Sequence, residues 1–300
     1  MLLKELRALG RLELSHLSQL PEPSTVSAES IKVEVDALLK HVLSKDQSWL
    51  LLHGENEVDE DSYRKFAEIL ERRKCSEPIA YIIGEREFYG MPFTVGPGVL
   101  IPRPETELVV EVALKHFSSK PESFYILDLC SGSGAILLAI ANQLRELYGE
   151  DYLSQGELVG SDISDEALII AKANSVRFGL DRCVSLIKSD LLAQVTIDVE
   201  NVAVGFTANP PYVEDSFDLP IDIERYEPKI ALRAGVDGLD VIQRIIFQLA
   251  PFIRKGAFLV MEIGENQAVA IGRVLREAGL TNFHFHNDLF GKTRVLEVIK

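Results

Sequence analysis

The sequence predicts an α/β fold in which a mostly parallel sheet is covered by helices and preceded by a small all-helical N-terminal domain. From about residue 124 onward, short apolar runs alternate with helical patterns, which is typical of parallel strands joined by helical crossovers. The N-terminal part shows only helical patterns. The last two candidate strands are joined by residues 287–292. This connection is too short for a parallel crossover, so we expect an antiparallel pair there.

The predicted N-terminal helical domain spans residues 1–80. One predicted helix places Ile31, Val35 and Leu38 on a single face, and the segment 61–74 repeats the pattern. The pattern is equally compatible with two roles. The domain could be a cap that only adds stability, or a module that docks a partner.

Residues 81–103 are rich in aromatic and β-branched side chains with glycines between them, which predicts a hairpin linker. The next segment reads as a helix with Pro104 in its first turn. Residues 104–300 form the predicted α/β domain. Arg103 and Glu105 lie at this junction, where either a salt-bridged hinge or a wall of the active-site cleft would explain them.

Strand and helix patterns then alternate to the end of the chain, with an apparent insertion at 144–157. The candidate strands are 124–129, 157–163, 184–191, 201–211, 256–264, 282–286 and 293–300. The candidate helices between them are 134–144, 165–179, 239–253 and 266–279. Ligands of such sheets bind at the carboxyl ends of the parallel strands.

A glycine-rich turn between the first of these strands and its helix consists of Cys130, Ser131, Gly132, Ser133 and Gly134. Such a turn lets a ligand approach the backbone closely. A dinucleotide fingerprint would have glycine three residues after Gly134, where this chain has Leu137. Asp128, at the end of the strand, suits a cationic ligand better than a pyrophosphate.

The next two strands also end in polar residues. Asp162 can accept hydrogen bonds from a ribose diol, and Ser189, Asp190 and Leu191 suit the edge and face of an adenine. An Asp at a strand end is, by itself, more often a helix cap. Taken in order at successive strand ends, these features favour a nucleoside-bearing cofactor. They are similar to the binding elements of S-adenosylmethionine-dependent methyltransferases.

The fourth strand ends in Asn209, Pro210, Pro211 and Tyr212. The prolines fix φ and carry no N–H, which makes the loop rigid. The side-chain oxygen of Asn209 and one backbone carbonyl, most simply that of Pro210, form a pair of acceptors for an NH2 group on a planar carbon. Tyr212 offers a ring face. We therefore predict an amide or exocyclic-amine substrate, and Asn209, Pro210 and Tyr212 as catalytic residues that act without a dedicated base.

Composition narrows the partners and the compartment. The net charge of −15 disfavours unaided binding to a nucleic-acid backbone and suits a basic protein partner. No run is long enough to span a bilayer, and the N-terminus does not read as a secretory signal. Three cysteines fit neither a zinc site nor a disulfide framework. His284 and His286 lack a third ligand nearby, so we expect no metal. These features predict a cytoplasmic protein that binds neither membranes nor, stably, nucleic acid. We expect a monomer, although the sequence does not determine the oligomeric state.

From about residue 30 to its end, the chain resembles the N5-glutamine methyltransferases of peptide chain release factors. The blocks that carry the resemblance occur in the family's order: EPIAYIIGEREFYG, GPGVLIPRPETE, ILDLCSGSGAI, NPPYV, RYEPKIAL, GVDGLDVIQRI, LVMEIGENQ and NDLFGKTRVLEV. The PRPETE and YEPK blocks make the resemblance specific, because they are not general features of methyltransferases.

The resemblance implies a Rossmann-like, seven-stranded, mostly parallel sheet with an antiparallel last strand, and a helical N-terminal domain joined by a hairpin. We infer that this N-terminal domain docks the substrate. It implies methyl transfer from S-adenosyl-L-methionine to the glutamine of the Gly-Gly-Gln motif in release factors, which gives S-adenosyl-L-homocysteine and modulates translation termination. The implied cofactor-binding residues are Cys130, Ser131, Gly132, Ser133, Gly134, Asp162, Asp190, Leu191 and Asn209. The implied substrate-binding residues are Asn209, Pro210, Pro211 and Tyr212. Cys130 and Ser131 replace a frequent Gly-Thr, which predicts a slightly less adaptable loop.

Two other functions fit parts of the pattern. An adenine-N6 DNA methyltransferase would use the same acceptor loop on a flipped base, but the acidic balance and the lack of a basic recognition region argue against it. A non-catalytic protein that senses the cofactor or docks on the translation machinery would not need an intact acceptor loop beside an intact cofactor loop.

Overall fold

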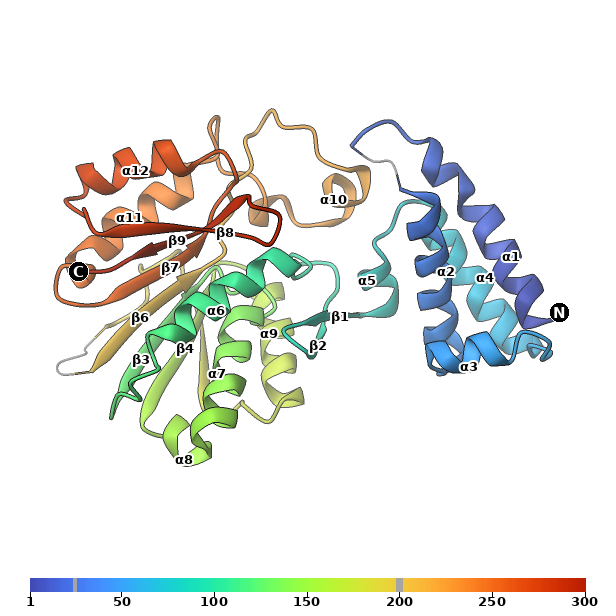
Figure 1. Cartoon of the computed structure of the whole chain (residues 1–300), viewed down its shortest axis with the longest axis horizontal. Coiled ribbons are helices and arrows are strands. Elements are labelled where there is room, and N and C mark those ends of the chain that lie inside the picture. The colour runs from blue at the N-terminus through green and yellow to red at the C-terminus, as the bar shows by residue number, and fades with distance from the viewer. Residues whose placement is uncertain (24–25, 198–201) are drawn as a thin grey trace. The chain divides into compact units, whose positions relative to one another are not determined.

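The computed structural model describes residues 1–23, 26–197 and 202–300. Two compact units make up the chain. Figure 1 shows their elements, coloured by residue number. The helical unit comprises Met1–Glu85 together with Asp218–Glu227, and the α/β unit comprises Arg86–Phe217 together with Pro228–Lys300. The domain boundaries at 80 and 103 stay a prediction. The short segment Asp218–Glu227 packs with the helical unit, although it lies inside the stretch that the sequence assigned to the α/β domain.

The helical unit is built from amphipathic helices around one apolar core. Its elements are α1 (Leu3–Leu14), η1 (Ser15–Gln19), α2 (Ala28–Leu43), α3 (Gln47–Leu52), α4 (Glu60–Lys74), α5 (Ile79–Ile83) and α10 (Ile221–Tyr226). The predicted faces of α2 and α4 are buried, with Val35, Leu38 and Phe66 at 1% exposure or less. The side chains of Ser27 and Asp59 accept from the first-turn amides of these two helices and so define where each begins.

Helix α10 is fixed to the end of α4 by polar contacts. The Tyr226 hydroxyl donates to the Cys75 carbonyl oxygen at 2.9 Å, and Arg225 Nη1 donates to the same oxygen at 3.4 Å. Both contacts join residues about 150 positions apart in sequence. They explain why this short helix belongs to the helical unit.

The α/β unit contains a seven-stranded sheet and a small hairpin. The sheet has the order β5-β4-β3-β6-β7-β9-β8, and the predicted hairpin is the pair β1-β2. The strands are β1 (Glu85–Phe88), β2 (Met91–Thr94), β3 (Phe124–Leu129), β4 (Gly156–Asp162), β5 (Val184–Lys188), β6 (Ala203–Ala208), β7 (Phe258–Glu262), β8 (Phe283–Asn287) and β9 (Thr293–Val298). Strand β9 runs antiparallel to both β7 and β8, which confirms the predicted fold class and its reversed last strand.

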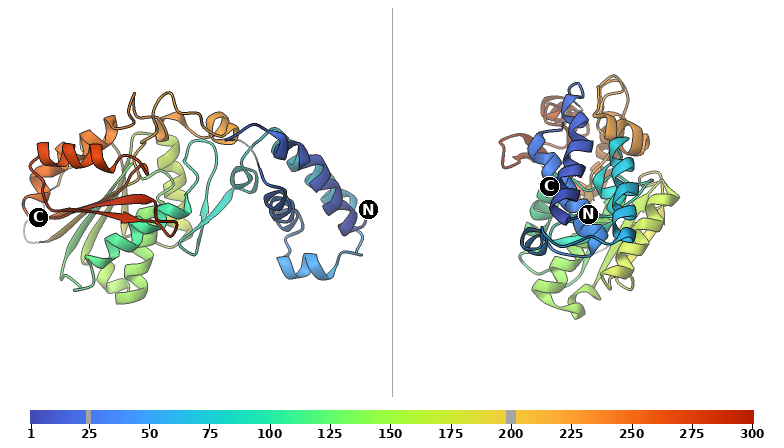
Figure 2. Two further views of the ribbon diagram at one scale, coloured as in Figure 1. Left: turned by 45° about the horizontal axis from the view of Figure 1, so that its top comes forward. Right: turned by 90° about the vertical axis from the view of Figure 1, so that its right-hand side faces the viewer.

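Helices cover both faces of the sheet, as Figure 1 and the turned view in Figure 2 show. The remaining elements are η2 (Pro104–Thr106), α6 (Glu107–Lys115), α7 (Ala135–Tyr148), α8 (Glu150–Leu153), α9 (Asp165–Arg177), η3 (Lys229–Ala231), α11 (Asp240–Ile253) and α12 (Ala268–Glu277). Successive side chains of β3 point to opposite faces of the sheet and so pack with the helices on both sides. Its Phe124 and Ile126 pack with α6 and α7, whereas Leu127 and Leu129 pack with α11 and α12.

The parallel register brings five chain segments to one edge of the sheet. Strands β3 to β7 all run in the same direction. The residues that follow their carboxyl ends therefore gather there. They are the glycine loop at 130–134 and the segments 162–164, 189–191, 209–212 and 262–264. None of the helices in the described ranges is long and apolar enough to cross a membrane.

Asn174 of α9 fastens the hairpin to the glycine loop. Its Nδ2 donates to the Thr94 carbonyl at 3.0 Å and to the Ser133 carbonyl at 2.9 Å, and its Oδ1 accepts from the Thr94 amide at 2.8 Å. The side chain is fully buried. Without it, three backbone groups would lose this partner, one of them in a buried place and two in partly buried places.

We expect Asn174→Ala to lower the free energy of unfolding by about 2–4 kcal/mol, because stranded buried polar groups keep their desolvation cost. Urea denaturation followed by circular dichroism measures it. Lys172→Ala, at an exposed position two residues earlier on the same helix, should change stability by no more than about 0.5 kcal/mol. Equal losses of unfolding free energy in the two variants would contradict the role of Asn174 in joining the hairpin to the glycine loop.

Candidate active site

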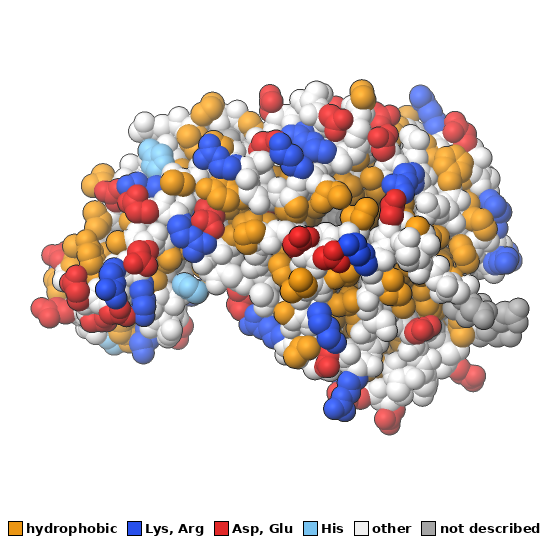
Figure 3. Space-filling view, turned by 180° about the vertical axis from the view of Figure 1, so that it is seen from behind, with side chains coloured by type: hydrophobic (Ala, Val, Ile, Leu, Met, Phe, Trp, Pro, Cys, Tyr) orange, Lys and Arg blue, Asp and Glu red, His pale blue; other side chains and the backbone are white. Residues whose placement is uncertain are grey.

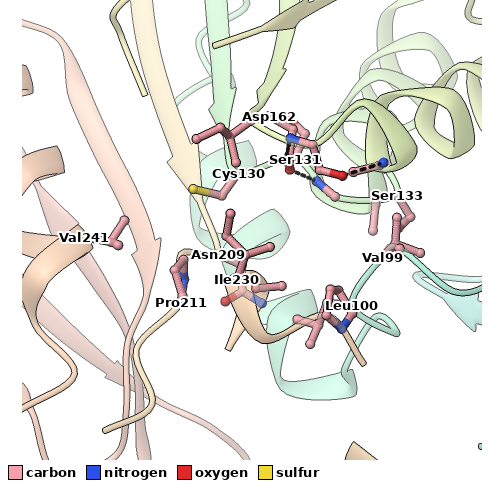
Figure 4. A pocket seen from close by; sticks show the side chains of 18 of the residues that line it. Val99, Leu100, Cys130, Ser131, Ser133, Asp162, Asn209, Pro211, Ile230 and Val241 are labelled. Atoms are coloured by element: carbon pink, nitrogen blue, oxygen red, sulfur yellow. Dashed lines mark hydrogen bonds between the residues drawn. The ribbon is translucent and has the colours of Figure 1, made fainter. Parts of the chain in front are cut away.

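A cavity of about 260 Å³ opens at the carboxyl edge of the sheet. The predicted residues that line it are Cys130, Ser131, Gly132, Ser133, Asp162, Asp190, Leu191, Asn209 and Pro211. Figure 4 shows Asn209 and Pro211 facing the same cavity as Cys130 and Asp162. Gly134, Pro210 and Tyr212 are not among the lining residues. The structure therefore joins the two predicted half-sites, one from the first three strands and one from the fourth.

The glycine loop is a tight turn with left-handed residues. Gly134 has φ +80°, and a Cβ there would lie 3.0 Å from the Leu138 side chain. Ser131 closes the turn, since its amide donates to the Ser161 carbonyl at 3.0 Å and its Oγ donates to the Asp128 carbonyl at 2.9 Å. Cys130 also has a positive φ, of 56°, which a side chain tolerates only under strain.

Asp162 binds the glycine loop from the neighbouring strand. Its Oδ2 accepts from the Gly132 amide at 2.8 Å, and its Oδ1 accepts from the Ser164 amide at 3.0 Å. The N-cap of α9 is Ser164, whose side chain accepts from the Ala167 amide. Each carboxylate oxygen has a second lone pair, so the helix-start contact leaves acceptor capacity beside the cavity. The predicted ribose contact stays a prediction.

Ser189, rather than Asp190, holds the segment after β5 in place. Ser189 Oγ donates to the Leu191 carbonyl at 2.7 Å and accepts from the Gln194 amide at 3.1 Å. This fixes Leu191 with φ +54° against the cavity. Both oxygens of Asp190 lie 2.8 Å from Arg244 Nη2, so its carboxylate already has a cationic partner. Arg244 also lines the cavity, and the sequence did not single it out.

Two fully buried acids lie at the carboxyl ends of β3 and β7, the strands on either side of β6. Asp128 Oδ1 accepts from the Thr207 hydroxyl at 2.7 Å, and its Oδ2 has no hydrogen-bond partner within the described ranges. Burial raises the pKa of Asp128 to about 7. Burial likewise raises the pKa of Glu262 to about 7, although hydrogen bonds from Thr106 and Tyr212 oppose the shift.

Glu262 organises the acceptor loop. Thr106 Oγ1 donates to Glu262 Oε2 at 2.5 Å, and the Tyr212 hydroxyl donates to Glu262 Oε1 at 2.8 Å. Asn209 Nδ2 in turn donates to Thr106 Oγ1 at 3.1 Å. Burial, followed by the charge of Glu262, raises the pKa of Tyr212 above its usual value. The hydroxyl end of the Tyr212 side chain is thus used inside the protein, and its predicted ring contact with a substrate stays a prediction.

Sequence reasoning missed Thr106 and Glu262. A signal existed for Glu262, because an acid ends an apolar strand there as Asp128 does. Thr106 lies inside the PRPETE block, where Arg103 and Glu105 drew attention instead. Pro102 and Thr106 line the cavity, whereas Arg103 and Glu105 do not.

A second layer of contacts supports the acceptor loop from outside. Gln267 Nε2 donates to the Tyr212 carbonyl at 3.0 Å. Gly238 approaches the same carbonyl so closely that a Cβ would lie 2.2 Å from the oxygen. Backbone hydrogen bonds join Val213 to Leu232 and Ala234. The YEPKIAL, GVDGLD and EIGENQ blocks therefore supply the support of this loop.

Two family models match the chain. Residues 25–84 match the PrmC N-terminal domain, and residues 98–260 match the N-6 DNA Methylase model. The first match lies in the helical unit. The second covers the glycine loop and the acceptor loop.

Curated relatives match over nearly the whole length. The release factor glutamine methyltransferase of Clostridium botulinum is 33% identical over 276 residues, which is 91% of this chain and 94% of the relative. That of Aliivibrio fischeri is 35% identical over 270 residues, which is 89% and 90% of the two chains. That of Koribacter versatilis is 33% identical and covers 94% of each chain.

Solved structures confirm the fold at low sequence identity. The hMettl16 catalytic domain in complex with a MAT2A 3′UTR hairpin gives a TM-score of 0.54 at 14% identity, covering 77% of this chain and 82% of that one. The N-terminal domain of human METTL16 in complex with SAH gives a TM-score of 0.50 at 15% identity, with 87% and 93% covered. The α/β unit thus has a methyltransferase fold.

The buried Asp128 carboxyl generates a pH-dependent stability. Its folded-state pKa of about 7 exceeds the ordinary value of 3.8, so the folded protein binds this proton more tightly than the unfolded chain does. The acid therefore costs stability progressively as pH rises from about 4 to about 7. We expect Asp128→Asn to gain on the wild type over this window by a few kcal/mol, roughly 1.4 kcal/mol for each unit of raised pKa.

Urea denaturation at several pH values between 4 and 8 measures the difference. Asp181→Asn, at an exposed position of the same unit, is the matched control for losing any carboxylate. A difference between Asp128→Asn and wild type that stays flat or narrows with rising pH would refute the assignment.

Proposed function

The chain belongs to the release factor glutamine methyltransferase family, and from this premise we propose its reaction in detail. The protein transfers a methyl group from S-adenosyl-L-methionine to the side-chain amide nitrogen, N5, of the glutamine in the Gly-Gly-Gln motif of peptide chain release factors. S-adenosyl-L-homocysteine is the second product. Methylation at this motif modulates translation termination.

The observation that carries the proposal is the orientation of the Asn209 amide. Its Nδ2 is engaged by Thr106, so its Oδ1 is the end that remains for a ligand in the cavity. An oxygen at that place accepts from an N–H group. A primary amide requires a second acceptor, and we assign this role to a backbone carbonyl of the loop, most simply that of Pro210, which is not itself among the lining residues.

The other half of the cavity fits the cofactor. The glycine loop exposes backbone beside the cavity, Asp162 offers carboxylate oxygens for a ribose diol, and Leu191 offers an apolar face for an adenine. Asp128 leaves one buried carboxylate oxygen without a partner in the described part of the chain, next to the same loop. Acceptors and negative charge suit a sulfonium cofactor better than a pyrophosphate.

When bound, S-adenosyl-L-methionine supplies an electrophilic methyl group on a positively charged sulfur. An amide nitrogen is a poor nucleophile because its lone pair is delocalised into the carbonyl. Asn209 Oδ1 and the Pro210 carbonyl would hold both N–H bonds, fix the direction of the nitrogen and favour the positive charge that develops on it. The methylated, protonated amide is strongly acidic, so its proton leaves without a dedicated base.

The match to the N-6 DNA Methylase model favours an exocyclic amine of DNA as the second candidate substrate. The same pair of acceptors would bind it. The net charge of −15 argues against it, because DNA binding needs Lys and Arg to neutralise phosphates. On the face shown in Figure 3, basic side chains are interspersed with acidic ones rather than gathered into a continuous strip.

We expect label from S-adenosyl-L-methionine to enter an intact release factor, and neither DNA nor the same factor with its motif glutamine replaced. Scintillation counting of the separated products measures this, and mass spectrometry locates the added methyl group. Label in DNA alone would favour the second candidate. Label in no substrate would overturn the proposed function.

We expect Asn209→Ala to lower kcat about 100-fold or more, because it removes one of two acceptors that act on the developing charge. Cofactor affinity, measured by calorimetry, should change much less, since most predicted cofactor contacts come from 130–134, Asp162 and Leu191. The control is Ile230→Ala, which truncates an apolar side chain at another lining position and should lower kcat much less than Asn209→Ala does. Near-normal turnover of Asn209→Ala would refute the acceptor role.

A further inference from the structure

Glu262 has no contact with the cavity, yet it controls the residue that does. The carboxyl lies at the end of β7 with 0% exposure, and its two oxygens accept from the Thr106 and Tyr212 hydroxyls. The distance of 2.5 Å to Thr106 Oγ1 is in the range of hydrogen bonds to an ionised carboxylate. A carboxylate carries no proton, so both hydroxyls must donate to it.

The single proton of the Thr106 hydroxyl determines how the Asn209 amide is turned. Because that proton is given to Glu262, Thr106 Oγ1 can only accept from Asn209. Only the NH2 end of the amide can donate, and Nδ2 is indeed the atom at 3.1 Å. The oxygen end must then face the other way, toward the cavity.

The opposite arrangement becomes available when Glu262 takes up a proton. The acid can then donate to Thr106 Oγ1, which frees the threonine proton to bind Asn209 Oδ1. The amide would turn by half a rotation and present its NH2 group to the cavity. Two N–H groups facing each other repel, so a substrate amide could not bind productively.

We propose that Glu262, acting through the Thr106 hydroxyl, is the positioning residue that keeps the Asn209 oxygen directed at the substrate amide. This inference rests on the proposed function. It makes Thr106 the link between a buried charge and the acceptor, and it predicts that turnover depends on the ionised form of Glu262. Neither residue needs to touch the substrate or the cofactor for this.

The charges around Glu262 influence the pH at which its carboxylate takes up a proton. Besides the two hydroxyls, Glu105 raises its pKa and Arg294 lowers it, both less than burial does. The result is a pKa of about 7, so the ionised form gains on the protonated form as pH rises through neutrality. The kcat of the wild type should therefore fall as pH decreases from about 8 to about 6.

The test compares Thr106→Ser with Thr106→Val on the full-length protein and an intact release factor. Serine keeps the hydroxyl, and valine keeps the shape but removes it. We expect Thr106→Ser to stay within about 3-fold of the wild-type kcat and to retain its pH profile. Thr106→Val should lose about 10- to 100-fold in kcat, with a smaller fall in kcat between pH 8 and pH 6 than the wild type shows.

A second variant, Glu262→Gln, tests the source of the charge. Its side chain cannot ionise, so its kcat at saturating cofactor should be reduced and should vary less between pH 6 and pH 8 than that of the wild type. Asp128, whose pKa is also about 7, remains as a second titrating group. Affinity for S-adenosyl-L-methionine, measured by calorimetry, should stay within about 3-fold in all variants and shows that each is folded. A structural role alone would not change the pH profile.

The inference is overturned if Thr106→Val keeps the wild-type kcat and pH profile, or if serine and valine lose activity equally with cofactor binding intact. It is also overturned if Glu262→Gln keeps the wild-type pH profile. A wild-type protein without activity on the release factor would overturn the proposed function, and with it this inference. The two failures are thus distinguished by the wild type alone.

Discussion

The buried carboxylate of Glu262 joins three segments of the chain at the edge of the sheet. A charge without water costs several kcal/mol unless hydrogen bonds replace its solvation. Here the replacements are hydroxyls from two separate segments, Thr106 before α6 and Tyr212 after β6. Because both must reach the end of β7, the entry to α6 and the acceptor loop are fixed to the sheet together. The geometry of Asn209 follows from that arrangement.

The two halves of the cavity are held by different means. The glycine loop and the segment after β4 are joined through backbone amides, with Asp162 accepting from Gly132 and Ser164. The acceptor loop depends on side chains and on a close backbone approach at Gly238. A half-site made from backbone depends on the φ angles of its residues, and the cysteine at position 130 occupies a strained positive φ. A half-site made from side chains tolerates few changes in them.

The sequence contained enough information for the fold and for most of the lining. Alternating apolar runs predicted the parallel strands, and the short connection at 287–292 predicted the antiparallel pair. Strand ends then located Asp162, Leu191 and Asn209, because parallel strands share one carboxyl edge. These predictions need only local pattern and topology.

What the sequence could not predict depends on the pairing of distant side chains. Thr106 and Glu262 are 156 residues apart, and nothing in either local segment indicates the other. Tyr212 shows the same limit, because its place in the motif suggested a ring facing the substrate. Nothing near Tyr212 in the sequence indicates that its hydroxyl binds Glu262, at the end of a strand 50 residues later. The packing of Asp218–Glu227 with the helical unit was equally hidden from local pattern.

That packing has a consequence for synthesis of the chain. Domains generally fold as units while the polypeptide emerges, with the N-terminal one first. Here the helical unit is assembled from Met1–Glu85 and Asp218–Glu227, so it cannot complete its contacts until residue 227 has left the ribosome. Most of the parallel sheet has been translated by then. The helical unit can still finish before the α/β unit, which needs the chain to Lys300, but only after much of the sheet has been translated. A fragment ending at residue 85 lacks α10, whose Tyr226 binds the end of α4.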